Sequence, residues 1–334
     1  MDLNILWFIL ITVLFTGFFV LEGFDYGVGM LLAGRNEKTR NQFVKSIGPV
    51  WDANEVWMIT AGGAAFAAFQ HFYAKMFSTF YLALFLMLFA LIMRGVAFEL
   101  RGKFQSSDWK KFWDGAIIFR SLVPALLWGV AVANLIQGLP IDPKMHYLGG
   151  FFDLLSPYTI LVGIMFVALF LFHGLNFLTM KLADEKLLFD LTKKSKCVGF
   201  FACATYLLFI VTNILMQMFG PDLSPRSIIC IIIFSAASGV LYSAWQFARV
   251  GRFKPAFLGT TVVTVMTTVG FFAALFPNLM ISSINPEWNL TIYNASSTPH
   301  TLTIMTVAAV IFVPIVLCYQ VWTYKIFRKR IAAE

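Results

Sequence analysis

The sequence is poor in charge: Asp, Glu, Lys and Arg make up only 13% of its 334 residues, whereas 59% are hydrophobic. A soluble domain of this length needs a far more charged surface. Apolar runs of about 20 residues recur instead, each long enough to cross a hydrocarbon core about 30 Å thick. The composition therefore predicts an all-α membrane protein that forms a single integral membrane domain over residues 1–334.

Cysteine and histidine are also scarce, with four of each. The cysteines form no CxxC or CxxCH pattern, so disulfides, a zinc site and covalent c-type haem are unsupported. Only His173 falls within a predicted helix, so the paired intramembrane histidines of a bis-histidine haem site are absent. We expect His173 to hydrogen-bond a neighbouring helix, with ligation of a cofactor as the alternative. No P-loop, dinucleotide fingerprint or catalytic triad is present, and no metal or cofactor is expected on this chain alone.

The net charge of +8 is distributed as in a membrane protein and does not indicate nucleic acid binding. Twenty of the 25 Lys and Arg residues fall in odd-numbered loops or after the last helix, and three fall in even-numbered loops. The positive-inside rule then places the N-terminus outside and the C-terminus in the cytoplasm. We expect about nine transmembrane helices, arranged as two four-helix bundles plus one peripheral helix. Their predicted ranges are 5–33, 49–70, 77–100, 112–136, 157–180, 198–219, 227–249, 256–276 and 301–324.

Acidic residues lie within the first two predicted helices. A charged side chain at the bilayer centre costs about 2.5–3.5 kcal/mol or more, so it needs a partner, water or a function. Glu22 and Asp25 share one helix face, as do Asp52 and Glu55. Because the first helix enters the cytoplasm and the second leaves it, Asp25 and Asp52 are expected at similar depths. Gly23 and Gly27 form a GxxxG pair that permits close helix contact.

The third and fourth predicted helices bring Arg94, Glu99, Asp114 and Arg120 to the same cytoplasmic zone. Proton uptake from the cytoplasm is the functional hypothesis, because buried carboxylates can relay protons. Plainer explanations stay open. The helix macrodipole alone favours acids at a helix start such as that of Asp52 and Glu55. Glu99 and Asp114 fit solvated helix ends, and the arginines fit snorkelling side chains.

Two long motifs point to a known family. GFDYGVGM at 23–30 and GPVWDANEVWMITAGGAAFAAF at 48–69 closely resemble subunit II of cytochrome bd-type quinol oxidases, and MRGVAFELR at 93–101 fits the same family. These motifs lie within the first 130 or so residues, and over the rest the resemblance is one of length and topology. Ala53 stands where the family commonly has Gly, a change that removes no chemical group.

The resemblance implies a haem-free subunit in the bacterial cytoplasmic membrane, paired with a subunit I that carries three haems and oxidises quinol while dioxygen is reduced to water. Subunit II would stabilise subunit I and supply proton access. Membrane lipid and a small single-helix subunit are further partners to consider. The expected proton-pathway residues are Asp25, Asp52, Glu22, Glu55 and Arg94, and Trp57 is a candidate for a subunit interface, a gas route or an interfacial anchor.

Two other functions compete with this one. A proton-coupled secondary transporter that acts alone would also place acids inside the membrane. A purely structural subunit would tolerate neutralisation of every buried charge. Isolation of a haem-coloured complex with a second membrane chain would exclude the transporter.

Overall fold

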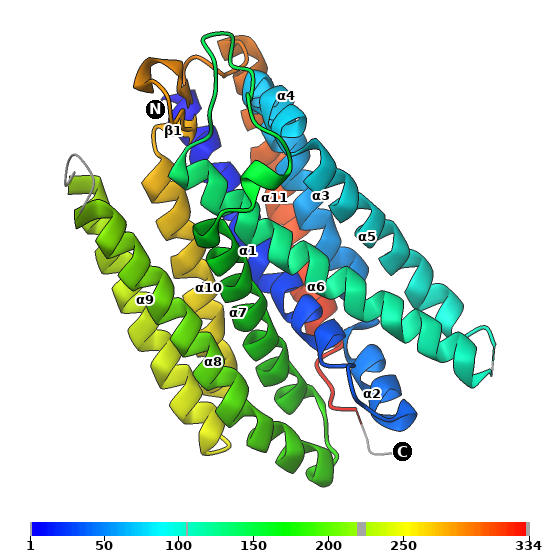
Figure 1. Ribbon diagram of the computed structural model, residues 1–334. Coiled ribbons are helices and arrows are strands. Elements are labelled where there is room, and N and C mark those ends of the chain that lie inside the picture. The colour runs from blue at the N-terminus through cyan, green and yellow to red at the C-terminus, as the bar shows by residue number, and fades with distance from the viewer. Residues whose placement is uncertain (1, 105, 219–224, 332–334) are drawn as a thin grey trace.

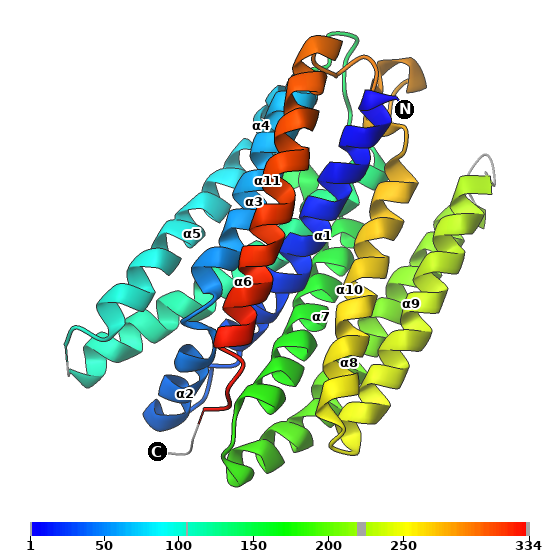
Figure 2. The same ribbon diagram turned by 180° about the vertical axis from the view of Figure 1, so that it is seen from behind.

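The computed structural model describes residues 2–104, 106–218 and 225–331, and most of them lie in long helices that run side by side (Figures 1 and 2). A two-stranded antiparallel sheet, β1 (Asn278–Met280) with β2 (Leu290–Thr291), lies in the loop before the last helix. The same loop holds the short helix η2 (Pro286–Trp288), and η1 (Phe152–Leu154) precedes α7. The α-helices are α1 (Leu3–Met30), α2 (Glu37–Ile47), α3 (Trp51–Ala68), α4 (Gln70–Thr79), α5 (Tyr81–Arg101), α6 (Ser107–Gln137), α7 (Pro157–Lys181), α8 (Glu185–Met218), α9 (Pro225–Arg249), α10 (Phe253–Leu275) and α11 (Pro299–Ile326).

Eight helices within the described ranges, α1 and α5–α11, are long and apolar enough to cross a membrane. They correspond to eight of the nine predicted spans. The remaining predicted span, 49–70, coincides with α3, whose 18 residues include Asp52, Asn54 and Glu55. Because its first turns are polar, α3 lacks an apolar stretch as long as those of the eight helices above.

Three helical segments were not predicted, because the prediction followed apolar runs. The first is α2, which is capped by the Asn36 side chain and buries Phe43 and Ile47, while most of its other residues are polar. The second is α4, which follows a break in the helical backbone at Phe69. The third is the charged first part of α8, which begins at Glu185 rather than at the predicted residue 198.

Helix α1 is central and contacts α3, α6, α7 and α10. Its glycines make this possible, as the GxxxG pattern predicted. A Cβ on Gly23 would lie 2.6 Å from the Phe170 ring, and a Cβ on Gly27 would lie 2.8 Å from Gly174 Cα on α7. Close backbone approach between small residues is a main source of helix association in lipid. The predicted close contact at Gly23 and Gly27 is confirmed, and it fixes the rotation of α1.

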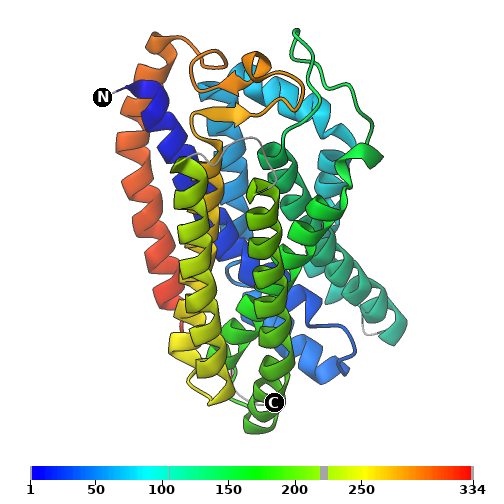
Figure 3. The same ribbon diagram turned by 60° about the vertical axis from the view of Figure 1, so that its left-hand side comes forward.

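The other helices lie on either side of α1. Helices α7, α8, α9 and α10 each contact the next, and α10 also contacts α7 (Figure 3). On the opposite side, α5 packs on α6 and α3 packs on α1. Helix α11 lies against α1 and α3, and buries only Leu302, Gln320 and Thr323. It ends beside α2, at the opposite end of the molecule from the start of α1 (Figures 1 and 2).

Replacement of Gly27 by Ala is expected to destabilise the protein by about 1–3 kcal/mol, because the added methyl group collides with α7 backbone that cannot move away easily. Thermal unfolding of the detergent-solubilised protein measures the effect. Gly239→Ala on α9 is the matched control, since a Cβ there meets no atom within 4 Å. Equal melting temperatures for the two variants would contradict the packing assigned to Gly27.

Candidate functional site

The most unusual feature of the interior is Arg94 of α5, whose side chain is fully buried and pairs with three carboxylates. Its Nε lies 2.8 Å from Glu55 Oε1 on α3, and one terminal nitrogen lies 3.4 Å from Asp25 Oδ2 on α1. The other terminal nitrogen pairs with Glu22 Oε1, also on α1. We call Glu22, Asp25, Glu55 and Arg94 the carboxylate cluster. It holds three helices together by charge.

Local sequence explains why these groups converge. Glu22 and Asp25 are three residues apart on α1 and so point the same way. The rings of Tyr26 and Trp51 lie beside the Arg94 guanidinium, with their centroids 5.6 and 5.7 Å from its central carbon. Aromatic faces attract a cation and shield it from solvent. The cluster is therefore largely shielded from solvent, and its charges depend on one another.

Asp52 is not part of this cluster. Its side chain is exposed in the first turn of α3, where the helix dipole stabilises an acid. The helical period instead turns Asn54 toward α1, where its Nδ2 donates a hydrogen bond of 2.8 Å to Asp25 Oδ2. Sequence reasoning paired Asp52 with Glu55 by spacing and passed over Asn54, because only ionisable residues were considered.

Arg120 of α6 is fully buried, as its place in a predicted helix suggested, but forms no ion pair within 4 Å among the described residues. Its guanidinium lies over the Phe98 ring, with 4.5 Å between its central carbon and the centroid. The buried position excludes snorkelling to the surface. A second positive charge therefore lies in the same part of the interior without a directly bonded acid.

Asp114, in the first turns of α6, was expected to fit a solvated helix end but is buried. Its Oδ1 lies 2.5 Å from Arg101 Nε, and its Oδ2 accepts a hydrogen bond of 3.0 Å from Arg40 on α2. Lys110 adds a contact of 2.8 Å to Glu37 and holds the pKa of this exposed carboxyl below its usual value. These pairs fasten α2 to α5 and α6. Glu99 is exposed, as a solvated helix end should be.

His173 joins three helices through its two ring nitrogens. Nδ1 lies 2.7 Å from Thr260 Oγ1 on α10, and Nε2 lies 3.1 Å from the Val20 carbonyl oxygen on α1. The expected hydrogen bond to a neighbouring helix is therefore confirmed. With both nitrogens engaged, His173 does not fit an axial haem ligand. The residues that the structure describes include no group of three or more His, Cys, Asp or Glu side chains placed to hold a metal ion.

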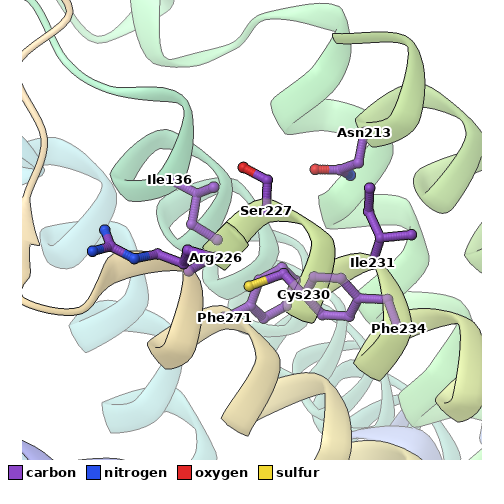
Figure 4. Close-up of a pocket in the computed structure, with 9 residues that line it drawn as sticks. Ile136, Asn213, Arg226, Ser227, Cys230, Ile231, Phe234 and Phe271 are labelled. Atoms are coloured by element: carbon purple, nitrogen blue, oxygen red, sulfur yellow. The ribbon is translucent and has the colours of Figure 1, made fainter. Parts of the chain in front are cut away.

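Two cavities lie away from the carboxylate cluster. One of about 190 Å³ lies among α6, α8, α9 and α10. Figure 4 shows that the Arg226 guanidinium points away from Asn213. Asn213 already accepts a hydrogen bond from Tyr158. The other, of about 100 Å³, is lined almost wholly by apolar side chains of α1, α3, α4, α5, α6 and α10. Neither cavity includes a member of the carboxylate cluster in its lining.

The family model for cytochrome bd terminal oxidase subunit II matches residues 3–327. The chain belongs to this family. It is 38% identical to the cytochrome bd ubiquinol oxidase subunit 2 of Bacillus subtilis, over 99% of this chain and 97% of that protein. It is 34% identical to the cytochrome bd-I ubiquinol oxidase subunit 2 of Escherichia coli K12, over 99% and 96% of the two chains.

The fold also agrees with a solved structure, a chain of the bd oxidase from Geobacillus thermodenitrificans. The TM-score is 0.76 at 14% identity, over 98% of this chain and 99% of that one. Membership of the family, together with eight apolar helices, makes this subunit II a multi-pass protein of the bacterial inner membrane and part of a quinol oxidase complex. The resemblance noted in its sequence motifs is confirmed.

Replacement of Arg94 by Gln should lower the melting temperature strongly, because three buried carboxylates lose their shared cation, and breaking a buried ion pair costs about 3–5 kcal/mol. Lys at this position should recover part of the loss. The control is Lys111→Gln, which breaks an exposed ion pair with Asp108 and should leave the melting temperature unchanged. A wild-type melting temperature for the Gln variant would show that the carboxylate cluster contributes little to stability.

Proposed function

We propose that this chain is the haem-free subunit II of a bd-type terminal oxidase, which stabilises the haem-bearing subunit I and delivers cytoplasmic protons toward it. The haems and quinol oxidation belong to subunit I, where electrons from quinol reduce dioxygen to water. Water formation consumes protons, so the complex needs a path for them through low-dielectric protein. The single observation that carries the proposal is the carboxylate cluster, three acids and an arginine that lie together inside the chain.

The proposed topology has nine crossings in one integral membrane domain. In this topology α3 also spans the membrane, although its polar residues lower its mean hydropathy. The N-terminus is outside and the C-terminus is in the cytoplasm, as the distribution of Lys and Arg indicates. One four-helix group consists of α1, α3, α5 and α6, the other of α7 to α10, and α11 is peripheral. This arrangement puts α2 and the entrance to the carboxylate cluster on the cytoplasmic side.

The proton route follows a gradient of exposure along the acids. Asp52 is exposed at the start of α3, the Glu55 side chain is 17% exposed, and Glu22 and Asp25 are fully buried. Asp52 and Glu55 share a helix face three residues apart, and Arg94 joins Glu55 to both acids of α1. We assign Asp52 to proton entry, Glu55 to transfer, and Asp25 with Glu22 to the inner end.

Trp57 fits the subunit interface better than a gas route. Its indole is half-buried against α1, where it fills the space left by the missing side chain of Gly17. It is not in the lining of either cavity. One side of the ring packs on α1, so the other side is free to contact subunit I or lipid.

Asp25→Asn should lower dioxygen consumption by about tenfold or more in the purified two-subunit complex, since an amide cannot exchange the proton that a relay passes on. An oxygen electrode with excess quinol measures the rate, and the haem spectrum checks assembly. Asp52→Asn should have a smaller effect, because an exposed entry point can be bypassed by water. Full turnover of Asp25→Asn at all pH values would rule out the route. Purification without a haem-bearing partner would instead favour an independent transporter.

A reporter active only in the cytoplasm should work when fused after Ile331 and fail when fused before Leu3. The reason is that nine crossings put the two ends on opposite sides of the membrane. Activity at both ends would mean an even number of crossings, and α3 would then not span. A fusion in the loop between α8 and α9, predicted outside, is the control for an external position.

A further inference from the structure

Asp25 is held by a group outside the carboxylate cluster. Asn54 of α3, which is fully buried, donates its Nδ2 hydrogen to Asp25 Oδ2 at 2.8 Å. The Oδ1 atom of the same amide faces α11. There it accepts a hydrogen bond of 2.8 Å from the Tyr324 hydroxyl and one of 3.3 Å from Gln320 Nε2. One asparagine thus connects the inner carboxylate to the last helix.

The chemistry of the neighbours fixes which way this amide points. On the α1 side, Asn54 faces the Asp25 carboxylate and, at 3.4 Å, the Leu21 carbonyl oxygen, and both of these accept hydrogen bonds. On the α11 side it faces a hydroxyl and an amide nitrogen that can donate. A flipped amide would place its oxygen against the two acceptor oxygens on the α1 side and its nitrogen against the Gln320 nitrogen on the α11 side. Tyr324 and Gln320 therefore keep the Asn54 donor directed at Asp25.

The two oxygens of Asp25 are consequently unequal. Oδ2 receives the Asn54 hydrogen bond and lies 3.4 Å from an Arg94 nitrogen. Oδ1 is buried and has no hydrogen-bond partner among the described residues. An oxygen that already accepts a hydrogen bond and faces a guanidinium cation is a poor site for an incoming proton. Oδ1 is the atom left to take it.

Although most of α11 is exposed, its C-terminal end is held in place by hydrogen bonds, so Tyr324 and Gln320 can orient the Asn54 amide. The segment that follows α11 pairs with the junction of α7 and α8. Ile331 N donates to the Lys181 carbonyl oxygen at 2.8 Å, and Ala183 N donates to the Ile331 carbonyl oxygen at 3.0 Å. Arg330 Nε adds a bond of 3.2 Å to the Met180 carbonyl oxygen. These bonds hold α11 at the level of Tyr324.

We propose that Asn54 is a positioning residue for proton transfer, oriented by Tyr324 and Gln320 of α11 so that Asp25 exchanges its proton through Oδ1. The inference rests on the proposed function of the carboxylate cluster. Neither the amide nor α11 carries the proton, because a neutral carboxamide is too weak an acid and too weak a base to relay one. The role of α11 is to set geometry from outside the route.

Tyr324→Phe removes one hydroxyl oxygen and leaves the ring in place. In the assembled complex it should lower the dioxygen consumption rate about three- to tenfold, as expected for one lost hydrogen bond to a group that aligns the reacting carboxyl. The Michaelis constant for quinol should stay unchanged, and the pH profile of turnover should be displaced. Tyr319→Phe on the exposed face of the same helix is the matched control, and should keep both the rate and the profile.

Asn54→Leu tests the same link directly and should reduce turnover at least as much. The double variant with Tyr324→Phe should be no slower than Asn54→Leu alone, since the tyrosine acts only through the asparagine. Additive losses would overturn the inference, as would wild-type rates and pH profiles for Tyr324→Phe with normal haem content. If those results came with a slow Asp25→Asn variant, the proposed function would survive without this positioning role. If Asp25→Asn were also fully active, both would fail.

Discussion

The buried guanidinium of Arg94 is the interaction on which the rest of the structure depends. Three carboxylates from two helices could not lie together in a bilayer without a cation between them, because their mutual repulsion would be unscreened. Arg94 in turn could not be buried without them. Each charge in the cluster thus lowers the energetic cost of burying the charges of opposite sign. These ion pairs therefore hold helices α1, α3 and α5 at one relative depth and rotation.

Packing of small residues makes that arrangement reachable. Gly23 and Gly27 let α1 lie directly against α7, so the opposite face of α1, with Glu22 and Asp25, turns toward α3 and α5. In lipid there is little hydrophobic drive to bring helices together, so close van der Waals contact has to supply it. The same helix thus uses glycine on one face for association and acids on the other for chemistry.

The hydrogen-bonded groups around the cluster divide into those that stabilise and those that direct. His173 ties α1 to α7 and α10 through both ring nitrogens, and Asp114 fastens α2 to the α5–α6 hairpin through two arginines. These contacts hold the framework. Asn54 differs because it bonds to a member of the carboxylate cluster and takes its own orientation from α11. A peripheral helix thereby acquires a part in the proposed chemistry without entering the route.

The sequence by itself determined the membrane class, eight of the helices and the GxxxG contact, and it placed Glu22, Asp25, Glu55 and Arg94 in one zone of the helices, because each follows from hydropathy or helical period. The long motifs at 23–30 and 48–69 determined the family. Only the tertiary structure decided that Asp52 is exposed while Asn54 faces Asp25, because the rotation of α3 depends on its contacts with α1. Only the tertiary structure showed that Tyr324 contacts Asn54, since a contact between residues 270 positions apart cannot be inferred from local periodicity. It also revealed α2, a mostly polar helix that packs against its neighbours but contains no apolar run from which it could be predicted.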